Sequence, residues 1–478
     1  MTHTLRAGIS RFAPFYIFLC SFFAIRLSSW AFIQHDIIEG SLVFALLLLL
    51  GLLYYKHPGW ALLLVYSELL LGGAGQFLQF GGLSLRTLYL ATFLLLWAIH
   101  SLYTHKKETL WVPQRLFYSI CVLFFVIGIA FVQGILHYPF MNVVRDALPF
   151  AFFLLLIPSY HLYVKEQTSI PTRYIKQLLA ASIIGSAIWG MSLFILFVTG
   201  TEQIHQPFYN WIRDVAAGKI TNMQTGFFRV VFPEHLFIPA AVLVLSATYT
   251  QQAKRLWLQI LLLAASLSIM AINLSRAYLL ALFVSFFILL YKQSWKQWLG
   301  IGLINTVLFL SIFFSLHLYG SGGQSWGLSL LGIRTQSIIQ PQIEESTYTR
   351  MSLLPPIYSH ISSSPLLGQG LGTTLTFMHP LSHTQIQTTQ FDWGYLELWV
   401  KLGIAGLILI LYLLLRISKE LLKQIQEQKE QELFFVGILA STGAYMIITI
   451  FAPVFMHVFG VVLLVATITL LQIKQKTG

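Results

Sequence analysis

The chain has 478 residues, of which 57% are hydrophobic and only 10% are charged. A soluble domain carries about 25% charged residues, so this composition excludes an ordinary soluble protein. The formal net charge of +12 is typical of nucleic-acid-binding proteins only where the basic residues gather in one patch. Their distribution along the chain therefore decides between nucleic acid and another explanation.

Apolar runs near the length of a helix that spans a bilayer recur along the whole chain. They predict an all-α polytopic membrane protein with about 14 transmembrane helices, within a range of about 12 to 14. The expected spans are 12–33, 37–55, 59–80, 83–104, 115–135, 143–164, 175–199, 233–250, 256–272, 277–291, 298–318, 395–416, 433–451 and 454–473.

The basic residues follow the topology that these spans imply. With the N-terminus inside, 19 of the 29 Lys and Arg residues fall on cytoplasmic segments. This is the positive-inside pattern, so the excess charge indicates membrane orientation and not a nucleic-acid partner. An even span number places both termini in the cytoplasm. The first span lacks a small-residue cleavage site and is expected to be retained.

Three regions are expected along the chain. Residues 1–318 form a transmembrane bundle of eleven spans with a shorter outer segment at 200–232. Residues 319–394 form a large extracytoplasmic segment, and 395–478 form the last three spans. A segment of this length without predicted spans is usually functional or disordered, and its Ile, Leu, Trp and Tyr content argues against full disorder. Its stretch "TYTRMSLLPPIYSHI" predicts a short helix broken at Pro355.

Two local features have ordinary structural interpretations. Cys20 and Cys121 lie inside predicted spans without metal or disulfide spacing, and we expect both to be small packing residues. The glycine-rich "GQGLG" at 368–372 resembles a phosphate-binding loop, but it does not open a helix within a βαβ unit. Backbone turning or close approach to a ligand is the expected role of its glycines.

Arg276 in "AINLSRAYLL" begins an apolar run at the outer end of a span. Asn273 or Ser275 is expected to cap the following helix, whose N-terminal amides add partial positive charge. A guanidinium beside a helix N-terminus favours an anion. The alternative is an interfacial arginine that extends its charged end to lipid head groups.

Other arginines lie on the same outer side. Arg145 enters a span beside Asp146, and the alternative to a functional role there is a local ion pair. Arg229 precedes a helix that Pro233 is expected to start, and its fork suits phosphate oxygens. Glu234 is expected to complement the dipole of that helix.

The long outer segment adds two further bases, Arg334 and Arg350, of which Arg334 is the more readily explained as solvated. Asp392 stands where that segment returns to the membrane. A partly desolvated carboxylate beside cations can act as a general base, and the alternatives are a helix N-cap or an interface anchor beside Trp393. The histidines lack metal-ligand spacing, so no metal site is predicted.

These residues lie in motifs that resemble the bacterial O-antigen ligase and O-antigen polymerase superfamily. "NLSRAYLLAL" is similar to its Ser-Arg segment, and "STYTRMSLLPPIYSHISSSPLLGQGLGTT" to its pattern of an Arg, a short helix and "PLLGxGxG". "DWGYLELWVKLGIAGLILIL" resembles its "YLxLxxxxGxxGL" segment, and "FFRVVFPEHLFIPAAVL" more loosely its upstream Arg segment. The resemblance covers roughly residues 220–415 as an ordered series.

The resemblance implies a GT-C-type membrane glycosyltransferase of the bacterial cytoplasmic membrane. Such enzymes move glycan from an undecaprenyl-diphosphate carrier to a glycan or lipid acceptor, with neither metal nor nucleotide sugar as cofactor. Arg229, Arg276 and Arg350 would bind the diphosphate and stabilise it as leaving group. Arg145 lies outside the matched residues and is a further diphosphate-binding candidate from its place on the outer side. The family's ligases carry a His-Asn pair where this chain has Asp392-Trp393, which favours a polymerase with Asp392 as base.

Other functions remain open at the level of sequence. A ligase would attach finished glycan to a lipid or protein. A flippase for lipid-linked oligosaccharide, or another transporter, would place charged groups deep in the spans, where Arg26 and Glu68 are found. A scaffolding role leaves the outer arginines unexplained.

Overall fold

A computed structural model describes residues 2–32, 35–73, 75–103, 114–165, 172–200, 202–223, 226–249, 256–340, 344–379 and 383–475. Within these ranges, 10 helices are long and apolar enough to cross a membrane. Shorter apolar helices cover Pro58–Gly72, Pro233–Thr248, Arg276–Tyr291 and Val458–Gln472. The prediction of an all-α polytopic membrane protein is confirmed. Every predicted span overlaps one of these helices, and the count of crossings stays a prediction.

The chain folds into two compact units, each assembled from separate stretches. The first unit comprises Met1–Glu108, Ile157–Leu274 and Leu299–Trp326, and the second comprises Thr109–Leu156, Ser275–Trp298 and Gly327–Gly478. Helix α13 (Trp295–Gly320) runs across the boundary between Trp298 and Leu299.

The first unit is a bundle of helices with two small hairpins. Its helical elements are α1 (Thr2–Phe32), α2 (Asp36–Lys56), α3 (Pro58–Gly72), α4 (Leu85–Tyr103), α7 (Leu156–Tyr160), the π-helical η2 (His161–Lys165), α8 (Thr172–Thr199), α9 (Glu202–Asp214), η3 (Pro233–Phe237), α10 (Ile238–Thr248) and α11 (Leu256–Asn273). Its strands are β1 (Gln79–Phe80), β2 (Leu83–Ser84), β3 (Lys219–Asn222) and β4 (Phe228–Val231), paired as antiparallel β1–β2 and β3–β4.

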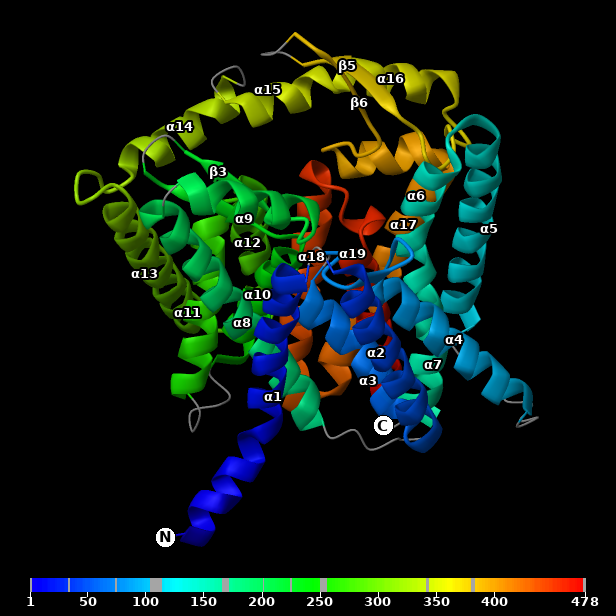
Figure 1. Ribbon diagram of the computed structural model, residues 1–478, viewed down its shortest axis with the longest axis horizontal. Helices are drawn as coiled ribbons and strands as arrows, with labels where there is room; N and C mark the ends of the chain where they lie inside the picture. Colours follow the sequence, from blue (N-terminus) through cyan, green and yellow to red (C-terminus); the bar gives the residue numbers. More distant parts are fainter. Residues whose placement is uncertain are drawn as a thin grey trace. The chain divides into compact units, whose positions relative to one another are not determined.

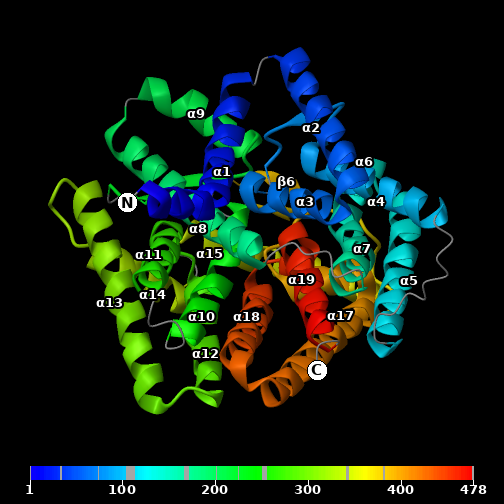
Figure 2. The same ribbon diagram turned by 90° about the horizontal axis from the view of Figure 1, so that it is seen from below.

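Helix α8 is packed against both α1 and α11, as Figure 2 shows. Small residues allow the close approach that membrane helices use in place of a hydrophobic driving force. A Cβ at Gly185 would lie 2.8 Å from the ring of Phe22, which is fully buried on α1. In the same way, the absence of a Cβ at Gly190 allows the side chain of Ile272 on α11 to approach closely.

The outer segment predicted at 200–232 contains α9 and the β3–β4 hairpin. Thr221 pairs with Arg229 across this hairpin, so Arg229 stands on a strand. Pro233 begins the helical turn η3 directly after β4, as expected from the fixed φ of proline at a helix start.

The second unit contains the long outer segment and the C-terminal helices. Its helical elements are α5 (Gln114–His137), α6 (Phe140–Ala151), η1 (Phe152–Leu155), α12 (Arg276–Phe286), η6 (Phe287–Tyr291), α14 (Leu328–Ile339), α15 (Glu345–Ser352), α16 (Leu354–Ser363), α17 (Gly394–Glu427), η8 (Lys429–Gln431), α18 (Glu432–Phe451), η9 (Val454–Met456) and α19 (Val458–Gln475). Its strands β5 (Leu375–Met378) and β6 (Gln385–Thr388) form an antiparallel hairpin.

Helix α17 is interrupted near its start. Gly403 has φ 70° and ψ 178°, which breaks the helix into a short first part and a long second part. The single span predicted at 395–416 therefore contains a break that was not expected. Helices α5 and α18 both pack against α17, and α12 packs against α18.

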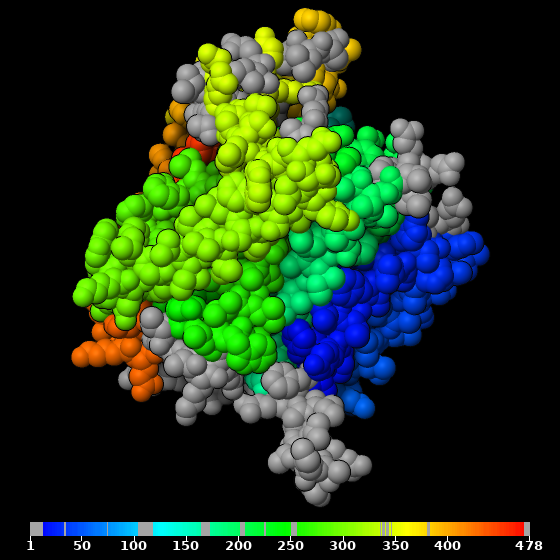
Figure 3. Space-filling model, turned by 90° about the vertical axis from the view of Figure 1, so that its left-hand side faces the viewer, coloured from blue at the N-terminus to red at the C-terminus, as the bar shows by residue number. Residues whose placement is uncertain are grey.

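The predicted outer segment 319–394 contains ordered elements. Figure 1 shows α14, α15 and α16, in yellow-green to yellow, following one another in an arc, with the β5–β6 hairpin beside α16. Helices α15 and α16 meet at Leu353, so the predicted break at Pro355 is confirmed within two residues. Leu353, Ile357, Phe391 and Val400 form one buried apolar cluster under the arc. The outer face of α14 belongs to the yellow-green surface in Figure 3 and exposes Leu328.

Candidate functional site

Arg276 is the first residue of α12, and its guanidinium reaches the residues around the start of α15. Nη1 lies 3.0 Å from Glu344 Oε2, and Nη2 donates a hydrogen bond of 2.6 Å to Thr347 Oγ1. Ser275 occupies the N-cap position of α12, as one of the two expected residues, but α12 has no side-chain cap hydrogen bond.

Glu344 joins Arg276 to a second arginine. Its Oε1 lies 2.6 Å from Nη1 of Arg334 on α14. Arg334 is 8% exposed, and burial lowers the pKa of its guanidinium while the Glu344 carboxylate raises it. Arginine stays charged at neutral pH, so this is a buried ion pair. The interpretation of Arg334 as a solvated residue is wrong.

Arg350 on α15 contacts the candidate base directly. Its Nε lies 3.0 Å from Asp392 Oδ2. Trp393 Nε1 donates a hydrogen bond of 2.9 Å to the backbone carbonyl of Arg350. Both charged side chains remain accessible, at 31% exposed for Arg350 and 53% for Asp392. The N-cap residue of α17 is Trp393 and it has no side-chain cap bond, so the alternative of Asp392 as N-cap is wrong.

These five side chains form what we call the arginine cluster: Arg276, Arg334, Arg350, Glu344 and Asp392. Arg350 lowers the pKa of Arg334, which shows that the two guanidinium groups lie within electrostatic reach of each other. Three positive charges and two negative charges leave one positive charge in the cluster. The arrangement favours a ligand with several anionic oxygens, because guanidinium groups bind such oxygens through charge-assisted hydrogen bonds.

Arg145 and Asp146 on α6 do not form the local ion pair considered as an alternative. Among the residues that the structure describes, Arg145 is exposed and has no ion-pair partner. Asp146 turns to the interior, where its Oδ2 lies 2.9 Å from Lys401 Nζ. Arg145 therefore stays outside the arginine cluster.

Arg229 belongs to the first unit, whereas Arg276 and Arg350 belong to the second. Its Nε donates a hydrogen bond of 2.6 Å to the carbonyl of Asn273 at the end of α11. The Asn273 side-chain nitrogen lies 3.2 Å from His235 Nδ1. The structure thus brings Arg276, Arg350 and Asp392 together within one unit, and Arg229 belongs to the other unit.

The first unit also contains a fully buried ion pair. Arg26 Nη2 on α1 lies 2.8 Å from Glu234 Oε1 on η3, with exposures of 0% and 5%. Arg26 also donates to the carbonyls of Phe22 and Leu71, and its guanidinium carbon lies 3.5 Å from the centre of the Phe22 ring. Glu234 is therefore an ion-pair partner, and the expectation that it only complements a helix dipole is wrong.

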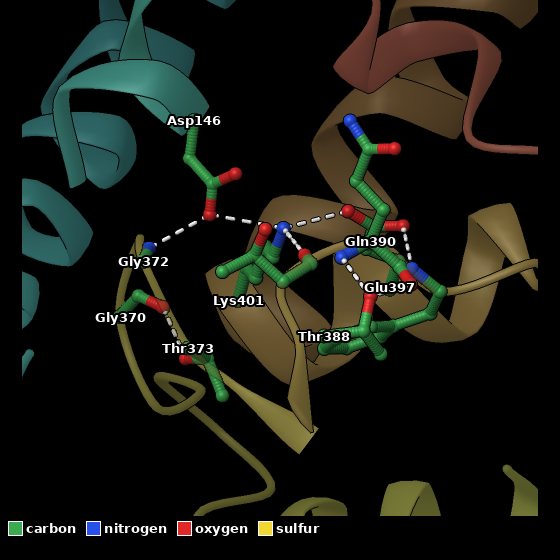
Figure 4. A network of polar contacts seen from close by, with 10 residues as sticks. Asp146, Gly370, Gly372, Thr373, Thr388, Gln390, Glu397 and Lys401 are labelled. Atoms are coloured by element: carbon green, nitrogen blue, oxygen red, sulfur yellow. Dashed lines mark hydrogen bonds and ion pairs between the residues drawn. The ribbon is translucent and has the colours of Figure 1, made fainter. Parts of the chain in front are cut away.

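A second buried ionic group lies at the start of α17 and is shown in Figure 4. Lys401 Nζ lies 2.6 Å from Glu397 Oε1 and 2.9 Å from Asp146 Oδ2, and it donates to the Thr389 carbonyl at 2.8 Å. Neither Lys401 nor Glu397 was a sequence candidate. Their spacing of four residues within an apolar segment was an available signal, because buried charges must be paired.

The glycine-rich stretch 368–372 serves backbone packing. Gly368, Gly370 and Gly372 all have positive φ, at 75°, 94° and 81°. The Leu371 amide donates to the Ala130 carbonyl on α5 at 2.9 Å. A Cβ at Gly370 would lie 2.7 Å from the Gly134 amide nitrogen on the same helix. The positive φ values agree with the expected role in backbone turning, and the close approach at Gly370 is to the backbone of α5.

The two cysteines differ from expectation. Cys20 and Cys121 are exposed on the surfaces of α1 and α5, so the prediction that they pack in the interior is wrong.

No protein-family model and no curated protein matches this chain. The geometry of the arginine cluster and the motifs that contain it are therefore the features that bear on function.

Proposed function

We propose that this protein is a membrane glycosyltransferase that polymerises undecaprenyl-diphosphate-linked oligosaccharide repeat units on the outer face of the bacterial cytoplasmic membrane. The observation that carries the proposal is the arginine cluster. It gathers the Arg of α12, the Arg of α15 and Asp392 from three motifs that are far apart in sequence. These are three of the four motifs that resemble the O-antigen superfamily.

The Glu344 carboxylate of the cluster occupies a position suited to diphosphate oxygens. Glu344 accepts contacts from two guanidinium groups at 2.6 and 3.0 Å, which is the geometry that a phosphate group also adopts with paired arginines. A diphosphate carries more charge than one carboxylate, so it competes for the same donors. Arg276 and Arg350 are the partly exposed donors that such a ligand meets first.

The proposed reaction is a displacement at the anomeric carbon of the donor sugar. An acceptor hydroxyl oxygen forms the new C–O bond, and the bond between the anomeric carbon and the diphosphate oxygen breaks. Asp392 accepts the hydroxyl proton as general base. Undecaprenyl diphosphate leaves with the electron pair, and Arg276 and Arg350 stabilise the developing charge. Arg229 is a further candidate from its motif, and Arg145 from its place on the predicted outer side.

A transport function is the second candidate, and one observation favours it. The Arg26–Glu234 pair is fully buried in the first unit, and charges inside the membrane commonly mark transport paths. Proteoliposomes that contain the pure protein and fluorescent undecaprenyl-diphosphate oligosaccharide separate the two functions. Movement of the lipid across the bilayer without new glycosidic bonds would replace the glycosyltransferase proposal with transport.

The polymerase proposal is tested in the source organism after deletion of this gene. Cells complemented with Asp392→Asn or Arg276→Ala are expected to carry single repeat units in place of long glycan, as seen on silver-stained gels. A ligase would instead leave long glycan attached to undecaprenyl diphosphate when its activity is lost. The gel and an extract of the lipid-linked glycan therefore distinguish these enzyme types.

Matched controls come from an exposed pair on α9. Arg213 and Asp214 lie 3.1 Å apart and are more than half exposed, so they repeat the charge types of the cluster without its surroundings. Arg213→Ala and Asp214→Asn are expected to support glycan of full length. If Asp392→Asn and Arg276→Ala do the same, the proposed function is wrong.

A further inference from the structure

Lys401 is fully buried although it is a primary amine on a membrane protein helix. Its side chain is 0% exposed, and the ammonium group is surrounded by Glu397, Asp146 and the Thr389 carbonyl at 2.6 to 2.9 Å. Taking three charges out of water costs several kcal/mol per ion, and apolar residues of the same size often stabilise a fold equally well. Stability alone therefore does not account for this choice of residues.

The contacts of Lys401 converge on the chain immediately before Asp392. Its ammonium binds the carbonyl of Thr389, and it lies 5.1 Å from the centre of the Phe391 ring. Glu397 completes the arrangement, because its Oε2 accepts the Phe391 amide at 3.0 Å. The backbone is thus fixed on both sides of Gln390 (Figure 4). Asp392 directly follows Phe391, whose amide makes the second of these contacts.

The same network fixes the loop that packs beside this segment. Asp146 Oδ2 accepts the Gly372 amide at 2.7 Å as well as contacting Lys401. The network therefore connects α6, the glycine-rich loop, the segment before α17 and α17 itself. One lysine holds these four elements in a single arrangement.

We infer that Lys401 and Glu397 are positioning residues that place the Asp392 carboxylate for proton transfer. The inference rests on the proposed function. Asp392 is half exposed and its ion-pair partner Arg350 is itself partly exposed, so the backbone before Asp392 must supply much of its placement. A misplacement of about 1 Å can reduce a catalysed rate about 100-fold.

The test compares Lys401→Met with Lys423→Met in detergent-solubilised full-length protein. Lys423 also forms an i,i+4 pair on α17, with Glu427 at 3.8 Å, but both side chains are more than half exposed. Titration with undecaprenyl diphosphate counts the binding-competent molecules. Turnover is measured with lipid-linked oligosaccharide extracted from the source organism and is expressed per binding-competent molecule.

Lys401→Met is expected to lower kcat at least about tenfold and to leave KM within about twofold, because the Asp392 carboxylate moves while the diphosphate donors stay. Lys401→Arg is expected to keep part of the wild-type kcat. The control Lys423→Met is expected to keep the wild-type kcat in full. Glu397→Gln keeps the side-chain shape and replaces Lys401→Met if that variant fails to fold. It is expected to lower kcat in the same way.

Two results separate the inference from the function beneath it. The positioning role would be overturned if Lys401→Met, or Glu397→Gln where it is used instead, had the wild-type kcat while Asp392→Asn was inactive. The proposed function would then stay intact. Wild-type turnover in Asp392→Asn would overturn the proposed function itself.

Discussion

Glu344 and Arg276 are 68 positions apart in sequence, yet Glu344 Oε2 lies 3.0 Å from Arg276 Nη1. The other oxygen of the same carboxylate contacts Arg334 at 2.6 Å. One acid thus holds two arginines that come from helices α12 and α14. The contact connects the start of α12 to the segment predicted to lie outside the membrane, and it gives the cluster an internal competitor for any anionic ligand.

This competition predicts the effect of Glu344→Gln. The amide keeps the size of the side chain but loses the charge, so the affinity for undecaprenyl diphosphate should increase roughly two- to fivefold, as expected for the loss of one partly screened ion pair. Isothermal titration in detergent measures the change. Weaker binding in Glu344→Gln would instead show that the carboxylate acts mainly by holding Arg276 and Arg334 in place.

A second prediction separates charge from geometry at Arg276. Arg276→Lys keeps the positive charge but loses the planar fork that binds two oxygens. We expect Arg276→Ala to weaken the binding of undecaprenyl diphosphate about 10- to 100-fold, because charge-assisted hydrogen bonds contribute about 1.5–3 kcal/mol. Arg276→Lys should fall between Ala and the wild type. Equal affinities for Lys and Arg at this position would show that charge alone matters.

A third prediction concerns the buried pair of the first unit. Arg26→Met removes one partner and leaves Glu234 charged in the interior, which should lower the free energy of unfolding by about 3–5 kcal/mol. Unfolding in mixed detergent micelles measures the change. The exposed pair provides the control, and Arg213→Ala should cost at most about 1 kcal/mol. A cost for Arg26→Met as small as that of the control would contradict the stabilising role of the pair.

Much of this architecture follows from local sequence, because apolar runs must cross the bilayer as helices whatever they pack against. The helix break near Pro355 was also predictable, since proline restricts the residue before it. In the candidate site, the sidedness of Arg276, Arg350 and Asp392 was predicted from the order of the spans. The ion-pair partners of these charged side chains could not be predicted in this way.

Pairing depends on contacts between residues that are far apart in the chain. Nothing local to Asp392 indicates that Arg350 lies 3.0 Å away, and nothing local to Asp146 indicates Lys401. The break in α17 was missed for a related reason. Gly403 is one of several glycines in an apolar stretch, and its positive φ and the close approach of the Leu366 backbone depend on residues far from it in sequence.

The last prediction tests whether the glycine-rich loop needs its close backbone contact. A Cβ at Gly370 would lie 2.7 Å from the Gly134 amide nitrogen and 3.0 Å from the Ala130 carbonyl oxygen, and its φ is 94°. Backbone atoms of α5 cannot rotate away as a side chain can. Gly370→Ala should therefore lower the free energy of unfolding by about 2–4 kcal/mol through crowding and strain together.

Gly81 supplies the matched control, because it also has positive φ, at 58°, but a Cβ there would meet no atom within 4 Å. Gly81→Ala should cost only about 1 kcal/mol, the backbone penalty by itself. Both variants are compared by unfolding in the same mixed micelles. Equal costs for the two substitutions would show that α5 moves aside, and that the loop is held by its other hydrogen bonds and not by contact through Gly370.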